Sequence, residues 1–255
     1  MVAPLSTRPT VPAGVWRASE LGAAALHTLG SGHRALDREL PGGGWPRASL
    51  TEILQAEPGR HEWRLLLPAL RRAAQAGPLV LIGPPHLPYL PALAGQGIAA
   101  ERLLRVEAGT PAERLWAAEQ ALRCGALGAL LLWLPQARPE ALRRLQLASA
   151  SGAVEAGPLV FVFRPLAVQR ESSPAPLRLS LQAGPRHGLT VQLLKRRGPL
   201  REQPLHLPAA LPAVLALRAP REPTGAPAEP ALETEHVVDR AGARRRSPAA
   251  ELLPA

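Results

Sequence analysis

The chain has 255 residues, enough for one large domain or two small ones with a substantial apolar core. No apolar stretch is long enough to cross a membrane without interruption by proline, arginine or glycine, and the first residues lack the pattern of a secretory signal. Cys124 is the only cysteine, which excludes an internal disulfide and a thiolate zinc site. These features predict a soluble, cytoplasmic protein.

The formal net charge of +10 suggests contact with nucleic acid, because clustered basic side chains neutralise phosphates. Lys195, however, is the only lysine among the 30 basic residues. The arginine bias of a GC-rich genome gives the same charge without any binding role. Composition alone does not separate these two explanations.

Composition predicts three parts of the chain. Residues 1–14 are proline-rich without periodicity and predict a flexible N-terminus. Residues 15–203 form the predicted folded core. Residues 204–255 are rich in proline and alanine and predict a largely disordered tail, because they offer little apolar surface to offset the entropy of ordering.

Within the core, apolar runs alternate with helical patterns. Helices are predicted at 16–29, 62–76, 111–124 and 139–150, and strands at 49–54, 79–82, 103–106, 128–133 and 158–163. Alternating residues at 177–182 and 189–194 then predict an antiparallel hairpin with one solvated face. This order predicts an α/β fold, a mostly parallel sheet flanked by helices. A ligand is then expected beyond the carboxyl ends of the strands, where the loop at 55–61 lies.

Several segments, in order, resemble the RecA core over roughly residues 16–200. They are HTLGSGHRALD (27–37), LPGGGWPRASLTEIL (40–54), PLVLIGPPH (78–86), CGALGALLLWL (124–134), PLVFVFRP (158–165) and LLKRRGP (193–199). Their particular form resembles the ImuA family, whose members are RecA-like accessory proteins of bacterial damage-induced translesion synthesis and are labelled SulA-like in some annotations. The resemblance implies a RecA-like fold.

The residues that hold nucleotide in that fold are replaced here. A phosphate loop needs G-x-x-x-x-G-K-S/T, in which glycine backbone groups and the lysine bind phosphate and the hydroxyl binds Mg²⁺. The corresponding loop positions hold Gln55, Arg60, His61 and Glu62, with Gly59 the glycine that remains. Trp133 stands where the magnesium-site Asp is expected, and Pro85 where the catalytic Glu is expected. The resemblance therefore implies a degenerate nucleotide site with no catalytic residue and no cofactor.

Two other surfaces correspond to binding regions of RecA-like proteins. In RecA-like proteins, single-stranded DNA passes the loops after the third and fourth central strands. The resemblance places the second of these loops at residues 164–174, with Arg164 and Arg170, and the hairpin end adds Lys195, Arg196 and Arg197. They predict either a weak DNA contact or a protein-docking face, and no aromatic residue interleaves with them to stack bases. Trp16, Leu21 and Leu26 lie where RecA carries its protomer-docking helix; packing on the chain's own core is the alternative.

We expect a non-catalytic adaptor of SOS-induced translesion synthesis. The resemblance implies three partners: ImuB, an error-prone C-family DNA polymerase and RecA. Two alternatives remain open, a SulA-like inhibitor of cell division and a weak ATP-dependent, DNA-binding enzyme with an altered loop. No metal site is expected, because no two histidines are spaced i,i+4.

Overall fold

The structure is a computed structural model, and it describes residues 27–151 and 157–209. All described residues belong to one compact unit. Three sequence predictions lie outside the described residues, namely the flexible N-terminus at 1–14, the docking residues Trp16, Leu21 and Leu26, and the disordered tail beyond residue 209.

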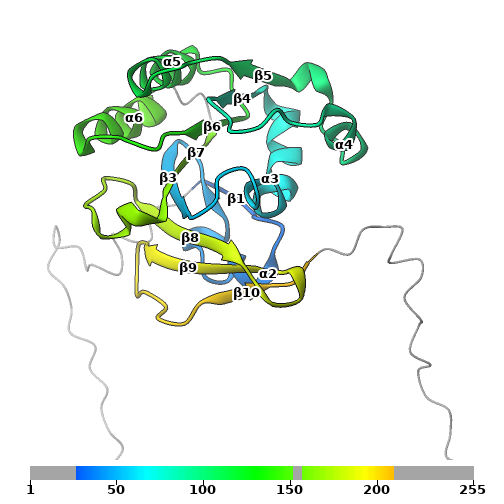
Figure 1. Cartoon of the computed structure of the whole chain (residues 1–255), viewed down its shortest axis with the longest axis vertical. Helices are drawn as coiled ribbons and strands as arrows, with labels where there is room; N and C mark the ends of the chain where they lie inside the picture. The colour runs from blue at the N-terminus through cyan, green and yellow to red at the C-terminus, as the bar shows by residue number, and fades with distance from the viewer. Residues whose placement is uncertain (1–26, 152–156, 210–255) are drawn as a thin grey trace, which may run out of the picture. The chain divides into compact units, whose positions relative to one another are not determined.

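Eight strands form one sheet in the order β10-β9-β8-β3-β7-β6-β4-β5 (Figure 1). In chain order they are β3 (Ser49–Gln55), β4 (Leu79–Ile82), β5 (Leu103–Val106), β6 (Ala129–Trp133), β7 (Leu159–Pro165), β8 (Leu177–Ala183), β9 (Leu189–Lys195) and β10 (Leu205–Leu207). All pairs from β8 across to β5 are parallel, whereas β9 is antiparallel to both β8 and β10. The predicted mostly parallel sheet with an antiparallel hairpin is therefore confirmed.

Helices cover both faces of the sheet. The longer ones are α3 (Glu62–Ala76), α5 (Pro111–Cys124) and α6 (Pro139–Ser151). α3 buries Leu66 and Leu70 in the same apolar core as Leu81 of β4. α5 and α6 bury Leu122 and Leu145 in a second core. Each of these helices has one apolar stripe, which it buries against strands whose side chains are apolar on both faces.

Shorter elements complete the described part of the chain. They are α2 (Arg34–Asp37), α4 (Leu90–Gly95), the 3-10 segments η1 (Pro41–Gly43), η2 (Ala100–Arg102), η3 (Leu166–Arg170) and η4 (Pro185–His187), and the two-stranded ladder β1 (Thr28–Leu29) with β2 (Trp45–Pro46). No helix in the described ranges combines the length and apolar character needed to cross a membrane.

The helix predicted at 16–29 does not continue to its expected end. Thr28 and Leu29 instead form strand β1, which pairs antiparallel with β2. Gly44 makes this pairing possible, because a Cβ atom at that position would lie 2.5 Å from the carbonyl oxygen of Leu29. Backbone contact with β2 therefore decides the conformation of these residues, and a helical pattern in the sequence does not reveal that contact.

Two predictions about the last strands need correction. The predicted solvated face of the hairpin is covered on β8, where Arg178 and Ser180 are buried. The folded chain also continues beyond residue 203, because β10 adds a strand at the edge of the sheet and buries Leu205 and Leu207. Three residues are too few for a periodic pattern, so the sequence alone did not separate β10 from the tail.

Thr110 caps α5. Its hydroxyl accepts a hydrogen bond from the Glu113 backbone N–H at 3.2 Å, and the Glu113 carboxylate accepts one from the Thr110 backbone N–H at 3.0 Å. The backbone hydrogen bonds from Thr110 and Gly109 hold the pKa of Glu113 below its ordinary value of 4.5. Because the folded-state pKa is lowered, this carboxylate stabilises the fold above its unfolded-state pKa, and the effect is lost as the pH falls through the folded-state value.

We expect Thr110→Ala to lower the free energy of unfolding by about 1 kcal/mol at neutral pH, because an N–H of the first turn loses its acceptor. Glu113→Gln should also destabilise the protein at neutral pH, and its difference from the parent chain should shrink as Glu113 becomes protonated in acid. Urea denaturation at several pH values measures both effects. Thr110→Ser is the matched control, since it keeps the hydroxyl; equal losses for the alanine and serine variants would contradict the capping role.

Candidate functional site

The loop between β3 and α3 is organised around a buried carboxylate. Glu62, the first residue of α3, is fully buried. Its Oε1 accepts hydrogen bonds from Gln55 Nε2 and the Gly59 backbone N–H, both at 2.6 Å, and from Trp133 Nε1 at 3.0 Å. Its Oε2 accepts one from the His61 backbone N–H at 3.0 Å. Four N–H groups therefore converge on one anionic side chain.

The position of Glu62 in the chain explains how a charge is tolerated there. The first turn of a helix presents unpaired backbone N–H groups and the positive end of the helix dipole, and both favour an anion. A buried carboxylate also needs hydrogen-bond donors in place of water, which the loop and Trp133 supply. The loop thus has its own anion at the site where the N-terminus of a helix attracts negative charge.

Gly59 is required by the close approach of the neighbouring loop. It has a positive φ of 87°. A Cβ atom at this position would lie 2.5 Å from His86 Cδ2 and 3.0 Å from Pro85 Cγ. The loop after β3 therefore packs directly against the loop after β4, and no larger residue fits between them.

The structure brings most of the predicted degenerate-site residues together. Gln55, Gly59, His61 and Trp133 all donate to Glu62, and Pro85 lies beside Gly59. Arg60 points away from this cluster: it is exposed and forms an ion pair with Glu57. The hydrogen bond from Arg60 holds the pKa of Glu57 below its ordinary value.

The sequence alone does not reveal the role of the Glu62 side chain. The structure places its carboxylate inside the loop as the acceptor for the loop's own donors. The signal that was available is an acidic residue at the first position of a helix after a tight turn, where negative charge is favoured.

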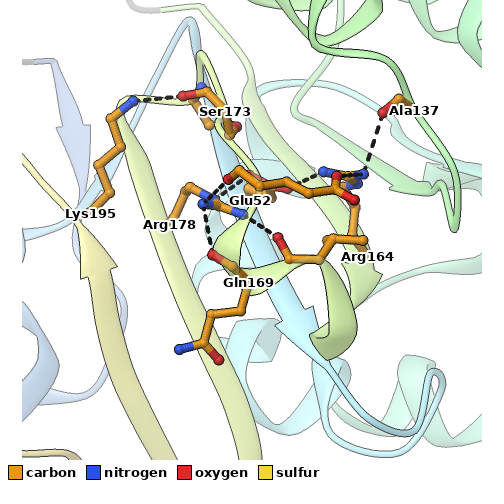
Figure 2. A network of polar contacts seen from close by, with 10 residues as sticks. Glu52, Ala137, Arg164, Gln169, Ser173, Arg178 and Lys195 are labelled. Carbon is orange, nitrogen blue, oxygen red and sulfur yellow. Dashed lines mark hydrogen bonds and ion pairs between the residues drawn. The ribbon is translucent and has the colours of Figure 1, made fainter.

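A second buried carboxylate joins three neighbouring strands (Figure 2). Glu52 of β3 is fully buried and lies opposite Arg178 of β8 in the strand register. Its Oε1 is 2.9 Å from Nη1 of Arg164, which comes from β7 on the other side, and its Oε2 is 2.6 Å from Nε of Arg178. The Arg178 contact is an ion pair by distance, but its N–H direction is unsuitable for a hydrogen bond.

The same two arginines hold the segment that follows β7. Arg178 donates to the backbone carbonyls of Val168 at 3.2 Å and Glu171 at 2.9 Å, with a longer contact of 3.4 Å to Gln169. Arg164 reaches the Glu171 carboxylate at 3.1 Å. The segment containing η3 is therefore fastened over β3 and β8. We call Glu52, Arg164 and Arg178 the buried clamp.

The clamp changes the interpretation of the predicted basic track. Arg164 is only 3% exposed and belongs to the clamp, so it is not available to a DNA backbone. Lys195 donates to the Ser173 carbonyl at 2.7 Å (Figure 2), and Arg196 pairs with Glu39 at 3.2 Å. Arg170 and Arg197 are exposed. The five positions therefore do not form one continuous exposed track.

No cluster of three or more histidine, cysteine, aspartate or glutamate side chains suited to a metal ion occurs in the described ranges. No model of a known protein family matches the chain, and no curated protein matches its sequence. The geometry of this loop and the sequence motifs therefore carry the functional argument.

We expect Glu52→Gln to lower the free energy of unfolding by about 3–5 kcal/mol, because two buried guanidinium groups lose the charge they share. Equilibrium denaturation with urea measures the loss. Glu57→Gln is the matched control in the following loop; its ion pair with Arg60 is exposed, so its removal should change little. Comparable effects of the two substitutions would show that the clamp does not stabilise the sheet.

Replacing Glu62 by alanine should leave the loop donors without an acceptor and lower the free energy of unfolding by at least about 2 kcal/mol. Free acetate should partly restore stability to this variant, because its carboxylate binds the same donors and thereby favours the folded state. The measurement is the shift in Tm when acetate replaces chloride at constant ionic strength. Glu57→Ala serves as the control variant, and an equal response of both variants to acetate would refute the role assigned to Glu62.

Proposed function

We propose that the chain is a non-catalytic, RecA-like accessory protein of SOS-induced translesion DNA synthesis, similar to the ImuA family. The observation that carries this proposal is the Glu62 carboxylate inside the loop after β3. A nucleotide phosphate at this loop meets both a buried negative charge and donors that are already used. Lysine, which binds the terminal phosphates in this class of site, is replaced by His61.

The contact between Glu62 and Trp133 adds to this support. In the RecA-like pattern, the position of Glu62 holds the hydroxyl that binds Mg²⁺, and the position of Trp133 holds the acidic residue of the magnesium site. In this chain the two side chains are hydrogen-bonded to each other at 3.0 Å. The replacements are therefore mutually compatible, which is what a retained fold without nucleotide chemistry requires.

The proposed role is that of an adaptor in the cytoplasm, in complex with ImuB, an error-prone C-family polymerase and RecA. An adaptor needs a stable scaffold that presents surfaces, and the buried clamp fixes the segment after β7 as one such surface. Arg170 is exposed on that segment, and Arg197 follows β9. Either residue can contribute a peripheral charge to a protein contact or to a weak DNA contact.

The experiment is a pull-down from purified components with the full chain as bait, and with ImuB, the polymerase and RecA tested singly and together. We expect at least one of them to be retained, equally with and without ATP and Mg²⁺, because binding does not depend on nucleotide. Arg170→Glu, Arg197→Glu and the double variant test the two exposed arginines, with Arg102→Glu as an exposed control far along the sheet.

Three outcomes contradict this proposal. Failure to retain any of the partners removes the adaptor role. Hydrolysis of ATP by the parent chain, abolished by a change in the loop such as His61→Ala, supports the altered enzyme instead. Filamentation of cells on overproduction, with no effect on induced mutagenesis, supports the inhibitor of cell division.

A further inference from the structure

A cavity of about 380 Å³ lies next to the filled loop, beyond the carboxyl ends of the parallel strands. Its walls include Trp133 and Phe163, whose rings stack with their centroids 4.7 Å apart. Prolines of the loops after β3, β4 and β6 add apolar surface, and the polar part of the lining consists of Gln55, Arg114 and the clamp residue Arg164. The volume is within the range of cavities that bind small ligands, and such cavities combine apolar walls with a few polar groups.

Arg114 provides a fixed positive charge in this cavity. Its Nε donates to the Ala108 carbonyl at 3.1 Å and its Nη1 to the Trp133 carbonyl at 2.9 Å. The guanidinium lies directly over Gly83, where a Cβ atom would be only 2.5 Å from Nε. Arg114 thus bridges the ends of β4 and β6 and the loop after β5, so its side chain is held in place before any ligand arrives.

The charge of Arg114 has no counter-ion among the described residues. Both of its hydrogen-bond acceptors are neutral backbone carbonyls, and no described carboxylate lies within 4.0 Å. Its second terminal nitrogen, Nη2, makes no hydrogen bond to another described residue. A preorganised guanidinium with unused donors in an apolar cavity favours a planar anion such as a carboxylate.

Gln55 supplies an independent indication of a ligand. Its side chain is 1% exposed and lines the same cavity. Its Nε2 donates to Glu62, whereas its Oε1 is buried without a hydrogen-bond partner. A buried carbonyl oxygen without a donor is costly, and a ligand with an N–H group removes that cost.

We propose that this cavity binds the carboxylate end of an N-acylated apolar amino acid, the unit found at the C-terminus of a peptide. The carboxylate pairs with Arg114, the amide N–H of the same residue donates to Gln55 Oε1, and the apolar side chain packs against Trp133 and Phe163. Phosphate fits the site poorly, because most of the walls are apolar, the second lining arginine, Arg164, is already paired with Glu52, and the buried Glu62 charge lies directly behind Gln55 and Trp133. This inference does not depend on the proposed adaptor function.

The test compares ligands on the unaltered full chain, so protein folding does not affect it. The probe is a fluorescein-labelled tetrapeptide, Gly-Ala-Leu-Phe, with a free carboxylate, and its control is the same peptide with a C-terminal amide. Fluorescence anisotropy should show that the free carboxylate binds at least about tenfold more tightly, because the amide loses a charge-assisted hydrogen bond to arginine. Equal binding of the two peptides, or binding of neither at about 1 mM, overturns the proposal.

Competition experiments distinguish two possible ligands with this chemistry, a small N-acylated amino acid and the C-terminus of a longer peptide. Displacement by N-acetylphenylalanine at concentrations similar to those of the unlabelled peptide assigns the site to the terminal residue alone, as in a small metabolite. Much weaker displacement assigns it to a longer peptide C-terminus. Displacement by inorganic phosphate at the same concentration shows a general anion site and overturns the proposal.

A protein variant then tests the position of the site. Arg114→Gln should weaken binding of the free carboxylate by about tenfold or more and leave the weak binding of the amide unchanged. Arg138→Gln is the matched control, because this exposed arginine lines a neighbouring cavity and not this one. Equal loss in both variants contradicts the assigned site. If Arg114→Gln fails to fold, the proposal is still tested by comparing how tightly the free-carboxylate and amide peptides bind the unaltered chain.

Discussion

The buried ion pairs of Glu52 determine how the middle of the sheet is assembled. β3 has β7 on one side and β8 on the other, and Glu52 pairs with an arginine from each of them. On this face α5 packs against β4 and β6 and α6 packs against β3, whereas the segment with η3 contacts β3 and β7. The ion pairs of the clamp therefore connect the strands in the region where apolar helix packing ends. A lone charge there would be strongly unfavourable, so the three clamp residues depend on one another.

Glu62 is also a buried carboxylate, but its charge is stabilised by a different kind of partner. Glu52 is neutralised by opposite charges, whereas Glu62 is held by neutral N–H donors at the start of a helix. Glu52 lies within β3, and Glu62 begins α3 just beyond the turn that follows the strand. The strand and its loop are thus built around negative charges of the protein itself. The donors of this loop therefore serve the fold, because they bind the protein's own carboxylate.

The parallel strands and the longer helices could be predicted from the sequence because their apolar runs and caps are local signals. α3, β4, β5 and α5 have the predicted bounds. β1, β10 and the covered face of β8 could not be predicted, since each depends on a partner distant in the chain. At the candidate site, the loop after β3 could be located from the sequence. The hydrogen bond from Trp133 to Glu62 and the ion pair of Arg178 with Glu52 could not, because they join residues far apart in the chain and no spacing reveals them.

The clamp also gives a physical reason for arginine at particular positions. Arg178 contacts a carboxylate and several backbone carbonyls at once, and Arg114 bridges the carbonyl of Ala108 in the loop after β5 and that of Trp133 at the end of β6. A lysine ammonium group is a compact point charge and cannot span such a set of acceptors. Some of the arginine side chains of this chain therefore have a structural role, because they connect loops to strand ends within the fold. Arg164 and Arg178 are buried, so these two of the basic side chains are not available for direct contact with a polyanion.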